Sequence, residues 1–166
     1  MIILILMLVV FINLILQTTI FPYIPILGVV PNISLLIVMT IALYKGRIYG
    51  GLISIVIGLM QDILFSPIIG LNAFIFFFAG YLIGLIENKL IKDNILIPIF
   101  LSIIGTIYYN FAYYIFMFFL SQEIEFLSFA KNILVVETIY NGLLAIPVYK
   151  IFSKIFTVPQ IRFGSK

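Results

Sequence analysis

The chain has 166 residues, of which 64% are hydrophobic and only 9% are charged, so its composition excludes an ordinary soluble domain. Such a domain is roughly half apolar and about a quarter charged. The absence of Cys and His excludes disulfides, thiol nucleophiles, Cys/His metal sites and imidazole catalysis. The net charge of +3 is too small to indicate nucleic-acid binding. The composition therefore predicts an integral membrane protein, and we expect no cofactor and no metal.

Six apolar segments predict a single all-α, polytopic membrane domain over residues 1–166. The predicted transmembrane spans are residues 2–21, 32–44, 48–65, 69–86, 95–120 and 133–152. Six helices of about 20 residues use about 120 positions, which leaves room only for short connections and tails. No basic segment precedes the first span, so we expect it to remain as a membrane helix rather than to be removed as a signal peptide.

The second predicted span, residues 32–44, is short, with a length of roughly 20 Å at a rise of 1.5 Å per residue. A proline-marked segment, residues 22–31, precedes it, and Pro31 lies near its start, where a proline does least harm. Two explanations remain open. Either the proline-marked segment lies in the membrane covered by protein, or the bilayer thins locally.

The basic residues predict the orientation of the chain. With six spans, eight of the nine Lys and Arg residues fall on one side of the membrane, and Lys131 alone falls on the other. Because cytoplasmic loops are enriched in Lys and Arg, we expect both termini in the cytoplasm. The residues expected to anchor the inner membrane surface are Lys45, Arg47, Lys89, Lys92, Lys150 and Lys154.

Small and polar residues recur at four-residue intervals within the predicted spans. Residues four apart share one side of a helix, and small residues let helix backbones approach closely. We interpret one such set as a helix-packing face or a face for a partner helix, and it consists of Gly50, Ser54, Gly58, Gly80 and Gly84. For a partner helix, Gly80 and Gly84 are the favoured positions.

The polar residues of the spans concentrate in the half that the predicted orientation assigns to the outside. They are Gln17, Gln61, Asp62, Asn72, Glu137 and Asn141. Polar atoms inside a membrane are costly and usually face protein or water. We therefore expect Asp62 to organise a polar cluster with Asn72 and Asn141, in which amide and hydroxyl partners hold the carboxylate or the carboxyl is protonated. For Glu137, a side chain that reaches headgroup water is an equal alternative.

These polar residues are a weak indication of catalysis. Two acids on different helices, without a His, a Cys or a nucleophilic serine turn, do not make an acid–base or nucleophilic site. The tyrosines of the fifth span, among them Tyr109 and Tyr113, are interpreted as membrane-interface anchors. We therefore expect a protein that is not an enzyme.

An ordered set of motifs runs along the chain. Residues 50–73 (GGLISIVIGLMQDILFSPIIGLNA) carry a glycine four residues before an acid, a short turn and a Gly-Leu pair. Further motifs are QTTIFP at 17–22, PNISLL at 31–36, GYLIG at 80–84 and YNGLLAIP at 140–147. Together they resemble the rod shape-determining protein MreD family over nearly the whole chain. Asn32 departs from the family pattern, which has an acid more often after this proline.

The resemblance implies a non-enzymatic scaffold of the bacterial cell-elongation machinery, located in the plasma membrane and surrounded by membrane lipid. It implies that the protein binds an MreC-like partner, which has a single span and a large outer domain. The resemblance implies that this partner links it to the actin-like MreB and to the peptidoglycan polymerase–transpeptidase pair, and that it thereby helps to regulate peptidoglycan synthesis. Formation of a homo-oligomer stays open.

The resemblance also implies a fold similar to that of the substrate-binding subunits of energy-coupling-factor transporters. The alternative function is therefore a small-ligand, vitamin-type binding subunit of such a transporter, whose pocket the outer polar residues would serve. Against it, the first predicted span contains no alanine, whereas those subunits dock their transport partner through an alanine-rich surface there. A small membrane hydrolase or transferase has the weakest support.

Overall fold

The structure is a computed structural model that describes residues 2–90, 94–120 and 134–156. Its main helices are α1 (Ile2–Ile15), α2 (Ile33–Phe65), α3 (Leu71–Ile86), α4 (Leu96–Phe119) and α6 (Val135–Phe156). Short π-helical and 3₁₀-helical turns cover Leu16–Ile20, Phe21–Tyr23 and Glu87–Lys89. Within the described residues, five helical segments are long and apolar enough to cross a membrane. The predicted all-α class is confirmed.

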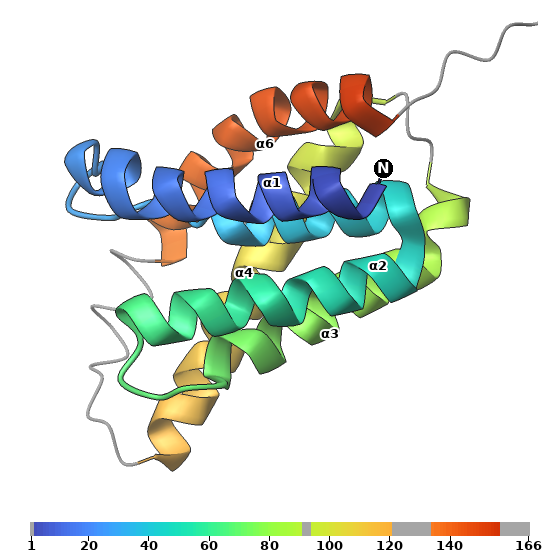
Figure 1. Cartoon of the computed structure of the whole chain (residues 1–166). Coiled ribbons are helices and arrows are strands. Elements are labelled where there is room, and N and C mark those ends of the chain that lie inside the picture. Colours follow the sequence, from blue (N-terminus) through green and yellow to red (C-terminus); the bar gives the residue numbers. More distant parts are fainter. Residues whose placement is uncertain (1, 91–93, 121–133, 157–166) are drawn as a thin grey trace, which may run out of the picture.

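Helix α2 consists of two arms that meet at Gly46. Gly46 has φ +76° and ψ −175°, a backbone conformation that is essentially restricted to glycine. Figure 1 shows the two arms, residues 33–45 and 47–65, running side by side in opposite directions. The arms touch close to the reversal, since a Cβ atom built on Gly50 would lie only 2.6 Å from the Cβ of Ala42. The connection predicted at residues 45–47 coincides with this reversal.

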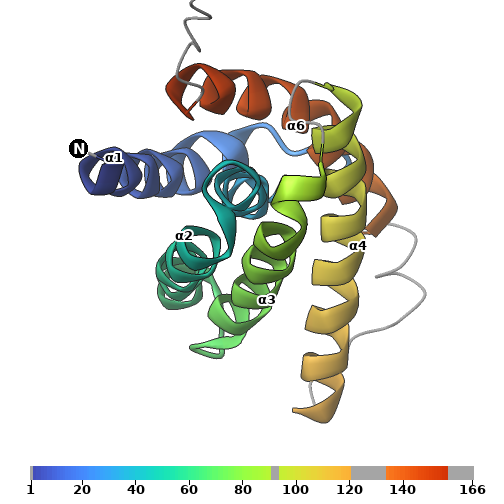
Figure 2. The same ribbon diagram turned by 90° about the vertical axis from the view of Figure 1, so that its right-hand side faces the viewer.

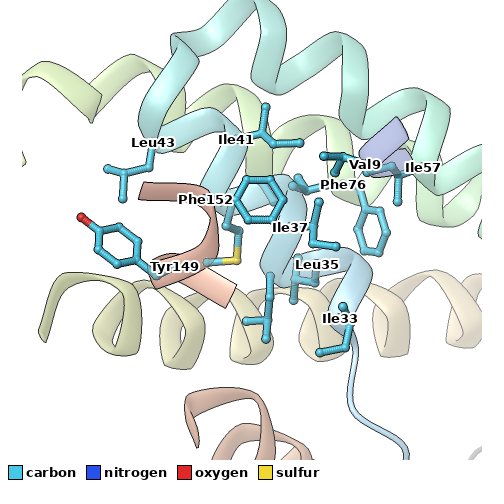
Figure 3. Close-up of a cluster of buried hydrophobic side chains, with 14 of the residues drawn as sticks. Val9, Ile33, Leu35, Ile37, Ile41, Leu43, Ile57, Phe76, Tyr149 and Phe152 are labelled. Carbon is cyan, nitrogen blue, oxygen red and sulfur yellow. The ribbon is translucent and has the colours of Figure 1, made fainter. Parts of the chain in front are cut away.

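The first arm of α2 is the centre of the bundle. Every residue from Pro31 to Leu43 is buried, and Figure 2 shows this arm enclosed by the other helices. Figure 3 shows its apolar side chains, such as Leu35, beside Val9 of α1, Phe76 of α3 and Phe152 of α6. A helix that is apolar on all sides suits either an enclosed position or contact with lipid, and this arm takes the enclosed position. The short second span predicted from the sequence is thus the enclosed core helix, whereas residues 22–28 of the proline-marked segment before it are exposed and not covered by protein.

The first and last helices differ from their predicted bounds. Residues 2–21 are helical, but after Ile15 the helix widens into the π-helical turn. There the Thr18 hydroxyl donates to the carbonyl oxygen of Leu14 at 2.8 Å, and such side-chain bonds compete with the regular helix pattern. Helix α6 continues to Phe156, beyond the predicted end at 152, because the Phe156 ring packs on the Tyr44 ring with centroids 6.1 Å apart.

Described basic residues gather at one end of the bundle, which we call the basic end. Figure 1 shows the start of α1, the reversal at Gly46, the end of α3 and the end of α6 at this end. The Lys45 ammonium lies 4.5 Å from the centre of the Phe156 ring, a favourable cation–π arrangement. The predicted anchors found in these segments are Lys45, Arg47, Lys89, Lys150 and Lys154. The sixth predicted anchor, Lys92, lies outside the described residues.

Candidate functional site

The Asp62 carboxylate is fully buried and caps the N-terminus of α3 from the preceding helix. Its Oδ2 atom accepts hydrogen bonds from the backbone N–H groups of Gly70, at 2.9 Å, and Ala73, at 3.1 Å. Its Oδ1 atom accepts from the backbone N–H and the side-chain amide of Asn72, both at 2.9 Å. All four hydrogen bonds to Asp62 come from N–H donors. This arrangement agrees with the first of the two interpretations given above, in which polar partners hold the carboxylate.

Helix α3 depends on this cap because its own N-cap residue, Gly70, has no side chain to provide one. The first N–H groups of a helix lack intrahelical partners, and the helix dipole favours a negative charge there. The buried acid thus ties the end of α2 to the start of α3. The sequence analysis did not predict this capping role. A buried acid shortly before a helix that begins at a glycine, which has no side chain to cap it, would have indicated the role.

Asn72 extends the Asp62 cluster to α4. Its Oδ1 atom accepts a hydrogen bond of 2.7 Å from the Tyr109 hydroxyl. The Tyr109 ring packs against Phe76, with centroids 5.6 Å apart, and against Tyr113, with centroids 5.9 Å apart. The expected pairing of Asp62 with Asn72 is therefore present in the structure. Tyr109, which the sequence suggested as an interface anchor, instead binds this cluster and links α3 to α4.

Asn141 belongs to a second cluster, built around Glu137 rather than Asp62. The Asn110 side-chain amide donates to Glu137 Oε2 at 2.8 Å. The Asn141 amide donates to Glu137 Oε1 at 3.4 Å and to the Thr106 hydroxyl at 3.0 Å. Glu137 is 5% exposed and Asn141 is fully buried, so the alternative in which Glu137 reaches headgroup water does not describe this structure. These bonds join α4 to α6.

Asn141 also holds the start of the central arm of α2. Its Oδ1 atom accepts a hydrogen bond of 3.0 Å from the backbone N–H of Asn32. The Asn32 side-chain oxygen in turn accepts from the Leu35 N–H at 3.0 Å, and so caps α2. An N-cap needs an acceptor rather than a charge. The uncharged Asn32 side chain therefore meets the need of this position.

A cavity of about 320 Å³ opens between the two clusters. Tyr109 contributes to its wall from the first cluster, and Asn110 and Glu137 contribute from the second. Gln17 and Gln61 also line it, and the Oε1 atom of each is buried without a hydrogen-bond partner. Of the six predicted polar residues, Gln17, Gln61 and Glu137 line this cavity. The other three, Asp62, Asn72 and Asn141, do not line it. Asn72 and Asn141 are hydrogen-bonded to the lining residues Tyr109 and Glu137, and Asp62 is hydrogen-bonded to Asn72.

The predicted small-residue face lies at the contact between α2 and α3, the most extensive helix–helix contact of the fold. A Cβ atom on Gly58 would meet the backbone of Ala73, and one on Gly84 would meet the backbone of Arg47. Both positions therefore let the two helices approach more closely than any larger residue allows.

The other residues of this small-residue face, Gly50, Ser54 and Gly80, also lie in close contact between α2 and α3. A Cβ atom on Gly50 would lie 2.8 Å from the Gly80 carbonyl oxygen, and the buried Ser54 hydroxyl donates to the Gly50 carbonyl. Gly80 and Gly84 are both buried. The idea that these two glycines offer an open face to a partner helix is thus corrected, because the protein's own α2 occupies that face.

The donor groups of the site and the similarity of the chain to known proteins both bear on what the site does. Within the described residues, no group of three or more His, Cys, Asp or Glu side chains comes together in a way that could hold a metal ion. The family model described as rod shape-determining protein MreD matches residues 1–155. No curated protein and no solved structure matches the chain. The family match covers the cavity and all of the described helices up to residue 155.

Proposed function

This chain belongs to the rod shape-determining protein MreD family, and we propose that it acts as a non-enzymatic membrane scaffold within the elongation machinery. Membership gives it a role in rod shape determination, as a multi-pass membrane protein associated with the MreC and MreB shape machinery. The observation that carries the proposal is the length of the match, residues 1–155 of 166. The structure agrees with this membership, since the described residues form apolar helices joined by short turns.

We propose that the chain crosses the bacterial plasma membrane six times, with both termini in the cytoplasm. The two arms of α2 then count as separate crossings, and the basic end of the bundle faces the cytoplasm. The eight-to-one distribution of Lys and Arg supports this orientation. With this topology, the two polar clusters and the cavity lie toward the outer surface, close to where the outer domain of an MreC-like partner begins.

The proposed partner is an MreC-like protein with one membrane span. Because the glycines at the α2–α3 contact are buried, its helix has to pack on an outward-facing apolar surface. Exposed side chains of this kind occur on α1, such as Leu8, on α2, such as Leu52, and on α4, such as Phe111. Through this partner, the scaffold would connect to MreB and to the peptidoglycan polymerase–transpeptidase pair and help to regulate peptidoglycan synthesis.

Co-purification in detergent tests the proposal directly. A photo-crosslinking residue is introduced separately at Leu8, Leu52 and Phe111, which are 56%, 59% and 62% exposed. We expect an MreC-like protein to co-purify and to crosslink from one of these helices but not from all three, because one partner helix covers one face. Absence of both co-purification and crosslinking, with the chain intact and folded, would contradict the scaffold proposal.

The second candidate is a vitamin-type ligand-binding subunit of an energy-coupling-factor transporter. The cavity of about 320 Å³ is the observation that favours it, since small-ligand pockets begin at about 300 Å³. The similarity of fold that this candidate needs stays a prediction. Neighbouring genes distinguish the candidates, because transporter ATPase genes beside this one favour the ligand-binding subunit, whereas cell-shape genes favour the scaffold.

A further inference from the structure

The two buried acids, Asp62 and Glu137, differ in how their carboxyl oxygens are held. Both oxygens of Asp62 accept hydrogen bonds of normal length, since its four N–H donors lie at 2.9–3.1 Å. Every one of these contacts uses Asp62 as an acceptor, and a carboxylate offers acceptor positions alone. The arrangement at Asp62 is thus that of a permanent carboxylate with a structural role.

The two oxygens of Glu137 are held unequally. Its Oε2 atom accepts from the Asn110 amide at 2.8 Å. Its Oε1 atom lies 3.4 Å from the Asn141 amide, which makes a shorter bond of 3.0 Å to the Thr106 hydroxyl. Hydrogen bonds of this type are usually about 2.7–3.2 Å long. A protonated carboxyl group needs one acceptor oxygen and carries its hydrogen on the other, so these contacts accommodate that form as well as the carboxylate.

The surroundings of Glu137 provide no cation. Among the described residues, the wall of the cavity contains neither Lys nor Arg, and α1 contributes the uncharged Gln17. The other titratable groups on the elements around Glu137 are two tyrosines of α4 and one acid of α2, namely Tyr109, Tyr113 and Asp62. A buried charge without an opposite charge is costly, whereas the Asn110 amide and the start of α6 favour a negative charge. These opposing effects leave neither form of Glu137 fixed.

The cavity gives the Glu137 carboxyl group a route to water. Glu137 is 5% exposed and forms part of the wall of this cavity of about 320 Å³. Such a volume has room for several water molecules, which can carry a proton between the medium and the acid. Ionisable side chains inside membrane proteins commonly take part in such proton transfer.

We propose that Glu137 is a proton-binding site, at which the carboxylate takes up one proton from the water of the cavity and releases it again. The step forms one O–H bond and needs no other reactant. Under the proposed orientation, this water is continuous with the outer medium. The proton binding itself depends neither on that orientation nor on the scaffold proposal, so failure of one leaves the other standing.

Proton binding at Glu137 acts on the junction of three helices. Asn110 joins Glu137 to α4, and Asn141 of α6 holds the backbone N–H of Asn32, at the start of the central arm of α2, at 3.0 Å. Uptake of a proton leaves Oε2 to accept from Asn110 and turns Oε1 from an acceptor into a donor, so its long contact with the Asn141 amide is lost. The proton thereby changes the contacts of the residue that holds the start of the central arm.

Infrared difference spectroscopy of the full chain in lipid vesicles tests the inference, because a protonated carboxyl group has a C=O stretching band that a carboxylate lacks. The pH is cycled between about pH 5 and pH 8, the range in which proteins are usually most stable. We expect a band that grows reversibly as the pH falls and that is lost in Glu137→Gln. The control Glu87→Gln, at the basic end, should keep this band. No band, a band of constant height, or one that a folded Glu137→Gln variant retains in full would overturn the inference.

A second variant keeps the carboxyl group and changes only its partner. Asn110→Leu removes the donor to Oε2, and a charged acceptor that loses a hydrogen bond is disfavoured relative to its neutral form. We expect the midpoint of the band's titration to rise by about one pH unit. This measurement does not depend on the folding of Glu137→Gln. An unchanged midpoint in a folded Asn110→Leu variant would overturn the assignment of the proton to Glu137.

Discussion

Replacement of Asp62 by alanine tests the cap of α3, because it removes the acceptor of four hydrogen bonds at once. Three backbone N–H groups and the Asn72 amide lose their partner. A buried unsatisfied donor costs about 1–3 kcal/mol, but the substitution also removes the cost of burying a charge. We expect a net loss of about 3–5 kcal/mol in the free energy of unfolding, because four buried donors each lose a hydrogen bond to a charged acceptor and part of this loss is offset by the removed charge.

The Asp62→Asn variant provides a graded comparison, since its single carbonyl oxygen retains part of the cap, and we expect a loss of about 1–2 kcal/mol. Reversible unfolding in mixed detergent micelles measures the free energy, and hydrogen exchange at residues 70–73 locates the effect. Lys150→Gln, at an exposed position of α6, is the control and should change stability by less than about 0.5 kcal/mol. If Asp62→Ala matches this control in both stability and exchange, the capping argument is refuted.

Three other predictions concern packing, backbone conformation and the link between α3 and α4. Gly58→Ala should destabilise the protein by about 1–3 kcal/mol, because its Cβ atom would meet the backbone of α3. The control is Gly142→Ala, whose Cβ atom would have its nearest neighbour at 4.0 Å. This control should be neutral or stabilising in the same unfolding assay. Gly46→Ala should cost about 1–3 kcal/mol through strain at φ +76°, and unchanged thermal stability would show that the α2 reversal differs from the one described. Tyr109→Phe should cost about 1 kcal/mol through loss of the hydrogen bond to Asn72; in a double-mutant cycle with Asn72→Ala the two losses should not add, and simple additivity would argue against that bond.

The sequence was informative about where polar residues lie along the chain but not about which of them meet. Four-residue spacing placed Glu137 and Asn141 on one side of α6, and the structure joins them. The same spacing says nothing about distances between helices. It therefore could not assign Asp62 to the backbone of α3 or Asn141 to the start of α2, because both contacts depend on how the turns fold back.

The glycines show the same limit. Their spacing predicted close helix contact, and α2 and α3 do meet there. It could not distinguish contact within the chain from contact with a partner, because both need small residues. The central arm of α2 is a further case. Its composition and length were predicted within a residue or two, but its enclosed position follows only from the arrangement of the surrounding helices.

The central claim is that the chain crosses the membrane six times and that its cavity faces outward. The most direct test of this claim is cysteine accessibility in intact cells. The chain has no cysteine, so single-cysteine variants report one position each. We predict that a membrane-impermeant thiol reagent labels Leu27→Cys, in a loop residue that is 84% exposed, without permeabilisation. Arg47→Cys and Asn88→Cys, both exposed at the basic end, should be labelled only after permeabilisation. Labelling of Arg47→Cys from outside, or protection of Leu27→Cys, would contradict the account.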